Sequence, residues 1–596
     1  MRFTLLTAGL AATTALTGLA FFLTPDGGTR PAAAATSAEE LFDPSYLRKA
    51  RCSGPIAQNP GVQLASRSAT EWLKGDDGRG PALRDDLGNV SIPITAADPT
   101  AQAYFDQGLR WTYGFNHHEA VRNFRKAQEI DPECAMCFWG EAFALGPNIN
   151  APMDAGAIAP ALAAVEKAIA LKDRAAAHEQ ALIDAIAVRY DATFGVTSES
   201  SQAFAEKMRR AAEAFPDNPN IQAIYVESLM DMQPWDYWER DGKTPKGNTA
   251  EAIAVLERTM KRHPDHPAAI HLYIHMTEAS RDPHRAEQPA DRLGGLMPGA
   301  GHLVHMPSHI YYRIGRYLDS LEANRAAALA DETYLKHAKA EGIYAGGYYP
   351  HNIHFMVTSA QMAGMKQEAI TAAERLLKVI DPEFAATVGW VQPIAAAPYF
   401  AHAQMGEPEE VLALPDPGKA LPYVQAMWRY ARGVALARQG NIDGARGEAA
   451  HVAAIREGTD WSGLAAWGVP APDLLGIAEL TVKARSAMAD GNAEQAISLF
   501  EEAVAVEAGI PYMEPPFWYY PVQQSLGAAQ LQAGDAAAAE RSFRAALMRH
   551  PNSGWAYFGL AQAMRAQDDI AGAEVVEGLF AQAWGGESGW LTVDRL

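Results

Sequence analysis

The sequence is poor in cysteine and in positive charge, and each shortage excludes a class of protein. Only three of the 596 residues are cysteine, so the chain has no framework of disulfide bonds and must rely on packing for its stability. The formal charge is −21. Because lysine and arginine supply most of the affinity for nucleic acid, we exclude nucleic acid as the main partner. An acidic field instead attracts cations, including metal ions.

Long apolar runs are absent after the first two dozen residues. At the N-terminus, Arg2 precedes an apolar run from Phe3 to about Leu23, and the small residues "PAAAAT" follow. This order predicts a cleaved signal peptide over residues 1–36 and export to the periplasm. An uncleaved N-terminal membrane anchor is the alternative. No later stretch reaches about 18 consecutive apolar residues, so we expect no membrane span in the mature protein.

Strand signals and the common catalytic motifs are also missing. The sequence contains no H-E-x-x-H, no G-x-S-x-G and no G-x-x-x-x-G-K-[ST]. A Gly-Ala-Gly occurs in "GLMPGAGHLV", but no predicted strand precedes it and the third glycine of a dinucleotide loop is absent. Any chemistry must therefore come from another arrangement of side chains.

A helical repeat fills most of the chain. Gly534 and Asp568 occupy corresponding positions 34 residues apart, which is the tetratricopeptide period. We predict an all-α fold, a TPR-like α-solenoid of helical hairpins with irregular inserts. The predicted regions are an N-terminal extension, partly ordered, over 37–95, a His-rich TPR-like helical region over 96–410 and C-terminal TPR repeats over 411–596. The aromatic inserts 233–249 and 509–524 are interpreted as packing wedges, or alternatively as an aromatic wall over a pocket.

Histidines are concentrated in one part of this array. Eleven of the 17 lie between His263 and His354. His271 and His275 are spaced i, i+4 on a predicted helix, so both imidazoles can reach one ion. Neighbouring repeats present further histidines on the same surface of a solenoid. We therefore predict a metal site with the ligand pool His271, His275, His302, His305, His309, His351 and His354.

Other residues are weaker candidates. His117, His118, Glu278, Cys134 and Cys137 form a second tier of metal ligands, and Trp235, Tyr311 and Tyr348 are candidates to line a pocket. The pair Cys134 and Cys137 is compatible with a disulfide, with half of a soft-metal site or with simple packing. For each aromatic residue the plainer interpretation is core packing.

The ligand chemistry favours copper over zinc or iron, because many imidazoles with few carboxylates suit these metals rather than magnesium or calcium. Six or more histidines suit two ions with about three imidazoles each, which leaves positions open for a small ligand such as dioxygen. The leading hypothesis is redox or hydrolytic chemistry on a small molecule, as in a copper oxidase or a metal-dependent hydrolase. The alternatives are a non-catalytic scaffold that binds envelope proteins or peptides, and a periplasmic copper- or zinc-handling protein.

Several of these stretches resemble a family of His-rich bacterial tetratricopeptide repeat proteins. The resemblance covers most of residues 96–575 and rests on segments such as "GFNHHEA", "CAMCFWG", "HLYIHMTEAS", "PGAGHLVHMPSHIYYRIGRY", "YYPHNIHF" and "EPPFWYYP". The family is defined by its repeats rather than by an activity. The resemblance therefore implies the fold and the ordinary role of such repeats, which is peptide or protein binding in a concave groove.

Overall fold

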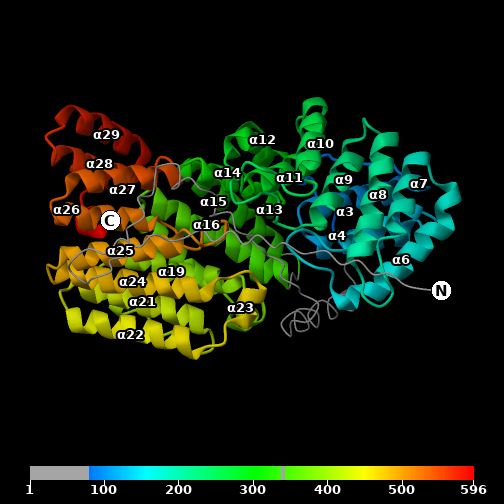
Figure 1. Cartoon of the computed structure of the whole chain (residues 1–596). Helices are drawn as coiled ribbons and strands as arrows, with labels where there is room; N and C mark the ends of the chain where they lie inside the picture. Colours follow the sequence, from blue (N-terminus) through cyan, green and yellow to red (C-terminus); the bar gives the residue numbers. More distant parts are fainter. Residues whose placement is uncertain (1–79, 337, 339–341) are drawn as a thin grey trace, which may run out of the picture. The chain divides into compact units, whose positions relative to one another are not determined.

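The computed structural model describes residues 80–336, 338 and 342–596, and these form an all-α structure (Figure 1). The predicted fold class is confirmed: the described residues form no β-strand, and only three isolated β-bridges occur among them. None of the described helices combines the length and the apolar character needed to cross a bilayer. The predicted signal peptide and most of the N-terminal extension lie outside the described residues.

The helices of the first half follow one another as antiparallel neighbours. Their bounds are α3 Pro99–Tyr113, α4 His117–Ile130, α5 Ala135–Ala144, α6 Ile158–Leu171, α7 Ala177–Ile186, α8 Ser198–Ala214, α9 Pro219–Asp231, α10 Thr249–Arg262, α11 Pro267–Thr277, α12 Glu287–Leu296, α13 Gly301–His305, α14 Pro307–Arg313 and α15 Tyr317–Leu335. Short 3₁₀ turns are η3 Ala155–Ala157, η4 Lys172–Arg174 and η5 Pro283–Ala286.

The second half continues the same arrangement. It comprises the π-helical turn η6 Tyr344–Tyr348, then α16 Tyr349–Met362, α17 Lys366–Val379, α18 Pro382–Thr387, α19 Val391–Met405, α20 Pro408–Leu412, α21 Pro422–Arg438, α22 Ile442–Gly458, α23 Ser462–Ala466, α24 Ala471–Ala489, α25 Ala493–Glu507, α26 Val522–Gln532, α27 Ala536–Arg549, α28 Gly554–Arg565, α29 Ile570–Ala583 and the 3₁₀ turn η7 Val593–Arg595. Many of these helices begin at a proline or an Asx cap, as expected for a first helical turn.

One packing device recurs at both ends of the described array. Gly108 of α3 and Gly140 of α5 leave room for the ring of Phe124 on α4, which lies between them. Phe543 of α27 fills the same gap between Gly527 of α26 and Gly559 of α28. In both places the three residues are spaced by sixteen. A glycine allows the close approach of two helices here because it carries no side chain.

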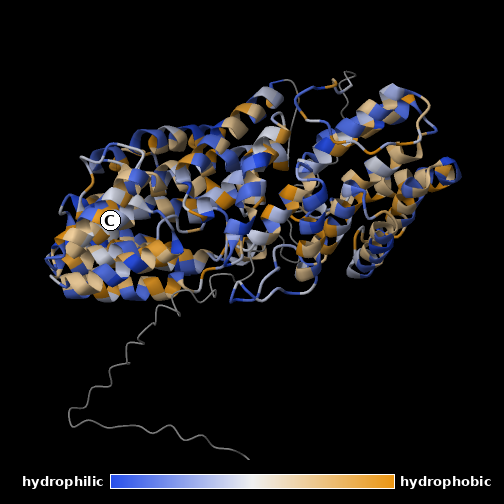
Figure 2. Cartoon of the chain, turned by 90° about the horizontal axis from the view of Figure 1, so that it is seen from above, coloured by the Kyte–Doolittle hydropathy of each residue, from blue (hydrophilic) through white to orange (hydrophobic). Residues whose placement is uncertain are grey.

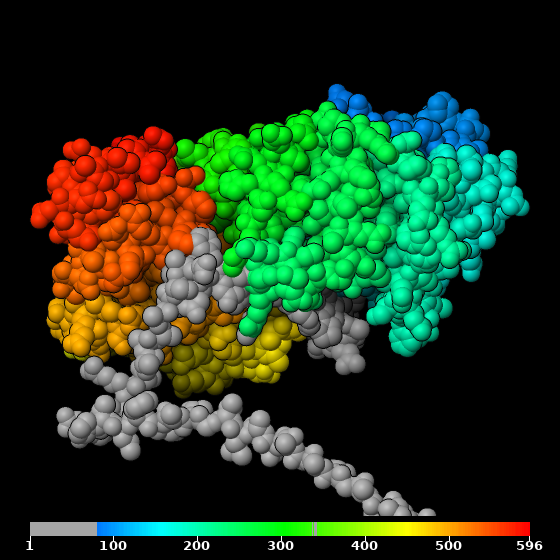
Figure 3. Space-filling model, turned by 45° about the horizontal axis from the view of Figure 1, so that its top comes forward, coloured from blue at the N-terminus to red at the C-terminus, as the bar shows by residue number. Residues whose placement is uncertain are grey.

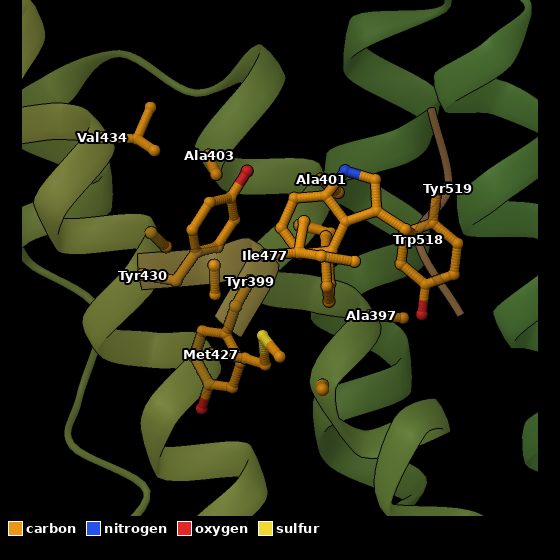
Figure 4. Close-up of a cluster of buried hydrophobic side chains, with 14 of the residues drawn as sticks. Ala397, Tyr399, Ala401, Ala403, Met427, Tyr430, Val434, Ile477, Trp518 and Tyr519 are labelled. Carbon is orange, nitrogen blue, oxygen red and sulfur yellow. The ribbon is translucent and has the colours of Figure 1, made fainter. Parts of the chain in front are cut away.

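The amphipathic helices bury their apolar stripes in two large hydrophobic clusters (Figure 2). One cluster runs from Leu87 to Tyr348 and the other from Leu321 to Leu596. Part of the second cluster is shown in Figure 4, where Trp518 packs between aromatic residues of α19 and α21. The histidine-bearing helices α11, α13, α14 and α16 lie where the two clusters meet.

The C-terminal repeat docks on this central region. The indole of Trp555 on α28 donates a hydrogen bond of 2.8 Å to the carbonyl oxygen of Gln361 on α16. In the space-filling view the red C-terminal helices adjoin the green middle of the chain (Figure 3). The position of α16 therefore depends on contacts with residues about two hundred positions later.

The glycine–phenylalanine device makes a testable prediction. We expect Gly140→Ala to destabilise the fold by about 1–3 kcal/mol, because its methyl group would overlap the buried ring of Phe124. The matched control is Gly447→Ala on α22, where an added Cβ meets nothing within 4 Å. There we expect stabilisation of about 0.5–1 kcal/mol from the higher helix propensity of alanine. Denaturant titration measures both, and equal effects at the two positions would contradict this account.

Candidate metal centre

Four short helices bring the predicted ligands together. Helix α11 carries His271 and His275, α13 carries His302 and His305, α14 carries His309, and α16 carries His351 and His354. Pro307 begins α14 directly after α13, so the two helices follow each other with one residue between them. The proline at position 307 favoured a helix start near that residue, with His302 and His305 on the lead-in before it. Both residues instead lie on the helical turn α13, and their side chains are buried.

Three imidazoles from α11 and α13 form a first triad. The Nε2 atom of His271 lies 3.1 Å from Nε2 of His275 and 3.2 Å from Nε2 of His302. All three side chains are buried. Two nitrogens bound to one tetrahedral zinc or copper ion at about 2.0–2.1 Å are separated by roughly 3.3 Å, so the first triad already has ligand spacing.

His305, His309 and His351 form a second triad. The Nε2 atoms of His305 and His309 are 2.7 Å apart, and a ring nitrogen of His351 lies within 4.8 Å of both. The two triads are neighbours: the ring centroids of His275 and His309 are 5.7 Å apart, and those of His302 and His305 are 5.9 Å apart. Six imidazoles thus divide into two groups of three that lie side by side.

Glu278 connects the two triads. Its carboxylate, which is fully buried at the end of α11, accepts a hydrogen bond of 2.8 Å from Nδ1–H of His275 and one of 2.7 Å from Nδ1–H of His309. The hydroxyl of Tyr512 donates a third bond of 3.0 Å. Burial alone would raise the pKa of Glu278, but the adjacent His309 and His275 lower it, so the group is a carboxylate.

The outer hydrogen bonds fix the tautomers of the triads. Nδ1–H of His271 donates to the carbonyl oxygen of Tyr113 at 2.9 Å, and Nδ1–H of His305 donates to Oδ1 of Asn324 at 2.6 Å. Asn324 in turn donates to the carbonyl oxygen of Ser320, which identifies its Oδ1 as the acceptor. A neutral imidazole with hydrogen on Nδ1 has a lone pair on Nε2. The 3.1 Å contact between His271 and His275 therefore sets one lone pair against another, because Nδ1–H of each ring already has an acceptor.

Protonation does not relieve the repulsion between the facing lone pairs of His271 and His275. Burial, followed by the charge of the neighbouring histidine, lowers the pKa of His271 well below its ordinary value, and the same holds for His302 and His305. Burial likewise lowers the pKa of His275 and, well below its ordinary value, that of His351. These rings are neutral at physiological pH and are ready to act as metal ligands.

Aromatic side chains hold the rings from outside. The ring of Phe115 lies 4.5 Å from that of His271 and stacks on His302 at 5.3 Å, while Phe355 stacks on His309 at 5.1 Å. The indole of Trp235 meets His275 edge-on at 5.0 Å. Phe115 and Trp235 both have a left-handed backbone with φ of 54° and 62°. Such strain in a residue other than glycine is typical of functional sites.

A small cavity opens on both triads. Its volume is about 50 Å³, and His275, His302, His309, His351 and His354 contribute to its wall. That volume holds a few water molecules, since one water requires roughly 10–15 Å³ on this measure. Both aromatic inserts reach it: Trp235 comes from the first, and Glu514, Phe517 and Tyr519 come from the second. The second insert also works as a packing wedge through Trp518, so both interpretations of this segment describe part of it (Figure 4).

The remaining predicted residues are placed differently. His354 belongs to neither triad and contacts the hydroxyl of Tyr519 at 2.8 Å through Nε2. Cys134 and Cys137 are joined in a disulfide, so their sulfurs are not free for a metal. His117 and His118 line a second cavity. Tyr348 and Trp235 line the cavity at the triads, whereas Tyr311 is turned away from it and donates to Asp291.

Three contributors were not singled out from the sequence. Glu514, Asn324 and Tyr512 support or line the site, but they are single residues of common types at positions without any spacing signal. Glu278 was predicted as a second-tier ligand; its carboxylate bonds to His275 and His309, and these three residues form a third group close enough to hold an ion. Its spacing of three residues from His275 on one helix was the signal that identified it.

Comparison with known proteins supports the repeat class. Residues 530–576 match the family model described as tetratricopeptide repeat. Solved structures with a related helical arrangement share little sequence with the chain. The human IFIT1 dimer with m7Gppp-AAAA is 10% identical with a TM-score of 0.32, covering 88% of this chain and 95% of that one. Yeast Tom70 is 12% identical with a TM-score of 0.24, covering 82% and 93% respectively.

A third structure, the APC/C hetero-tetramer Cut9–Hcn1, is 11% identical with a TM-score of 0.29, and the match covers 85% of this chain and 83% of that one. No curated protein matches the chain. The chain thus matches the tetratricopeptide repeat model over residues 530–576, and two histidine triads lie in its middle. The finer resemblance to a His-rich bacterial family stays a prediction.

Acid should weaken the start of α11, the helix that carries the first triad. Nδ1 of His266 accepts the hydrogen bond of the Ala269 amide and so caps this helix, while Nε2–H donates to Asn220. Burial, followed by the charge of His263, lowers the pKa of His266 to about 4. The neutral ring therefore stabilises the fold fully above pH 6.5, and this contribution is lost as the pH falls from 6.5 towards 4.

The measurement compares the free energy of unfolding of wild type with that of His266→Asn across this range. Asparagine can still cap the helix but does not titrate. The difference between the two proteins removes the opposite contribution of Asp331, whose pKa is raised to about 7 by burial. We expect the advantage of wild type to decline below pH 6.5. A difference that stays constant down to pH 4 would show that His266 is not the acid-sensitive cap.

Proposed function

We propose that the two triads hold two transition-metal ions, with copper favoured over zinc or iron, and that the centre carries out redox chemistry on a small molecule. The observation that carries this proposal is the close pairing of Nε2 atoms, 3.1 Å apart in His271 and His275 and 2.7 Å apart in His305 and His309. His271 and His275 each direct Nδ1–H to an acceptor, so their neutral rings set one Nε2 lone pair against the other. Two lone pairs repel each other unless a cation lies between them. Because burial lowers the pKa of both rings, a metal ion is the cation that fits.

The donor set supports copper. All six donors are imidazole nitrogens, and Glu278 supports two of them through their Nδ1–H groups instead of facing a metal position. Imidazole suits copper, zinc and iron, whereas magnesium, calcium and manganese prefer oxygen ligands. A carboxylate that accepts the outer N–H of a ligating histidine raises the basicity of the ring and fixes its direction.

The small number of protein ligands in each triad supports a catalytic centre rather than a metal-storage site. Three protein ligands per ion leave a coordination position free, which is the arrangement of catalytic rather than structural sites. The triads border the cavity, whose wall includes the triad histidines His275, His302, His309 and His351, so a bound ion would be accessible from it. The bound ions would supply redox change or Lewis acidity there, while the protein excludes bulk water and orients the ligand. Hydrolysis at a metal-bound water is the alternative chemistry of the same site.

Two further functions have support of their own. The C-terminal match to a tetratricopeptide repeat favours a surface for binding peptides or proteins, in addition to the buried centre. A metal-handling role draws on the same histidines. The burial of five of the six triad histidines disfavours it, because a carrier must release its ion to a partner.

We also propose export to the periplasm, or anchoring in the membrane that faces it. The disulfide between Cys134 and Cys137 supports this location, because such bonds persist in oxidising compartments.

Metal stoichiometry tests the proposal. We expect the protein, purified without a histidine tag and loaded with copper, to bind two ions per chain. His271→Ala combined with His302→Ala should remove one ion, and His305→Ala combined with His351→Ala should remove the other. The control is His402→Ala, which deletes a buried imidazole of α19 outside the centre and should leave both ions. Less than one ion in wild type, or no loss in the paired variants, would refute a dinuclear centre.

Glu278→Gln tests the link between the triads. A glutamine amide can accept a hydrogen bond at its oxygen but not at its nitrogen, so one of the two supported histidines loses its acceptor. We expect copper affinity to fall by about 10–100-fold, as for other outer partners of metal ligands. The matched control is Glu257→Gln on α10, which pairs with Arg285 at the surface. Competition with a chelator measures the copper affinity of both variants. An unchanged affinity in Glu278→Gln would show that this carboxylate does not support copper binding.

A further inference from the structure

The cavity at the two triads contains polar atoms that nothing in the protein satisfies. Five described residues that line the cavity each carry a buried side-chain atom with no hydrogen-bond partner: Nδ1 of His302, Nδ1 of His354, Oδ1 of Asn150, Nε1 of Trp390 and Oε2 of Glu514. Buried polar groups in folded proteins are nearly always paired. Five such atoms around one small space indicate that the space is built to receive a ligand with polar groups.

Two of these atoms have clear roles. Nε1–H of Trp390 is always a donor, and an indole has no acceptor atom to offer. Oε2 of Glu514 is an acceptor in a carboxylate, and in a carboxylic acid it either accepts or donates. Glu514 is more than nine-tenths buried, and it lines the same cavity as the histidines although it lies more than 150 residues after them. A hydroxyl group is the smallest single group that can both accept from Trp390 and donate to Glu514.

The rest of the wall offers no cationic side chain. Among the described residues no lysine or arginine lines the cavity, so an anionic organic molecule would have only the proposed metal ions to bind. Trp235, Phe517 and Pro516 supply flat apolar surfaces instead. Such a wall suits an uncharged ring that carries one polar substituent.

We propose that this cavity binds a small, uncharged, ring-bearing molecule through its hydroxyl group, with Trp390 donating to the hydroxyl oxygen and Glu514 accepting its hydrogen. This inference rests on the proposed function for the identity of the reacting centre and deepens it by naming the class of substrate. Glu514 and Trp390 act here as binding residues that set specificity. The hydroxyl-bearing end of the molecule lies in the space that borders the triads.

A second cavity gives the remainder of such a molecule a place. Asn150 and Tyr348 line both spaces, and the second has a volume of about 190 Å³. Its wall includes Phe115, which stacks on the first triad, and Met153. The shared residues indicate that the two spaces adjoin, so a molecule too large for the first can extend into the second.

The test compares phenol with toluene, which has nearly the same shape and lacks the hydroxyl. Ligand-observed NMR titration of the full chain, metal-free and copper-loaded, gives both dissociation constants. We expect phenol to bind more tightly, and we expect Glu514→Ala and Trp390→Phe each to weaken phenol by about three- to tenfold while leaving toluene unchanged. Glu514→Gln, which keeps an acceptor of the same size, should retain most of the affinity.

Matched controls lie outside the cavity. Trp428→Phe removes an indole N–H that donates to the carbonyl of Leu414, and Glu457→Gln changes an exposed carboxylate. Neither should alter phenol binding, and all variants should keep the copper content of wild type. If Glu514→Ala does not fold, Glu514→Gln and Trp390→Phe still report on the two hydrogen bonds.

The outcomes separate this inference from the metal proposal. Equal binding of phenol and toluene, no binding of phenol, or phenol binding that Glu514→Ala and Trp390→Phe leave unchanged would overturn the hydroxyl pocket. In that case water alone satisfies the polar atoms. Preference for phenol in a chain that binds no copper would overturn the metal centre and leave the pocket standing. Two bound copper ions without any preference for phenol would overturn the hydroxyl pocket and leave the metal centre standing.

Discussion

The centre depends on one buried carboxylate. Glu278 carries its charge in the interior, and such a charge is tolerated only when partners satisfy it. Its partners come from three places in the chain: His275 on its own helix, His309 on α14, and Tyr512 from the second aromatic insert. Satisfying this one group therefore fixes the two triads relative to each other and draws the insert over them. The solenoid supplies the curvature that makes the three meet.

The sequence predicts the fold class and the local pairing of histidines better than it predicts the tertiary arrangement of the site. The helical class followed from a repeat period and from capping residues, which are local signals. The pair His271 with His275 followed from i, i+4 spacing, because a helix turn alone sets that geometry. The pair His305 with His309 did not follow, because Pro307 favoured a helix start between them and the structure instead has the helical turn α13 before it. Two groups of about three imidazoles were expected, but the assignment of each ring to a triad depends on how α11, α13 and α16 are rotated about their axes.

Long-range contacts position the site residues that the sequence patterns did not reveal. Glu514 approaches the histidines only because α26–α29 fold back so that Trp555 bonds to α16 and the preceding insert covers the cavity. No pattern near Glu514 in the sequence records that contact. His354 shows the reverse case: it shares i, i+3 spacing with His351, yet its ring turns to Tyr519 because the insert offers a hydroxyl on that side. Spacing identified the candidate, and the tertiary partner decided its role.

The scaffold also explains why these imidazoles can lie so close together. Repulsion between facing lone pairs opposes the folded state, and flexible loops would relieve it by rotating away. Here four of the six rings are held at Nδ1, His271 by a carbonyl, His305 by an amide, and His275 and His309 by Glu278, while Phe115 and Phe355 pack against the triads. The left-handed backbone of Phe115 adds further strain at the same place. Such costs persist only where the surroundings enforce them, and packed helical hairpins with interlocking phenylalanines are stiff enough to do so. Under the proposed function, a bound ion would relieve this repulsion and thereby stabilise the fold.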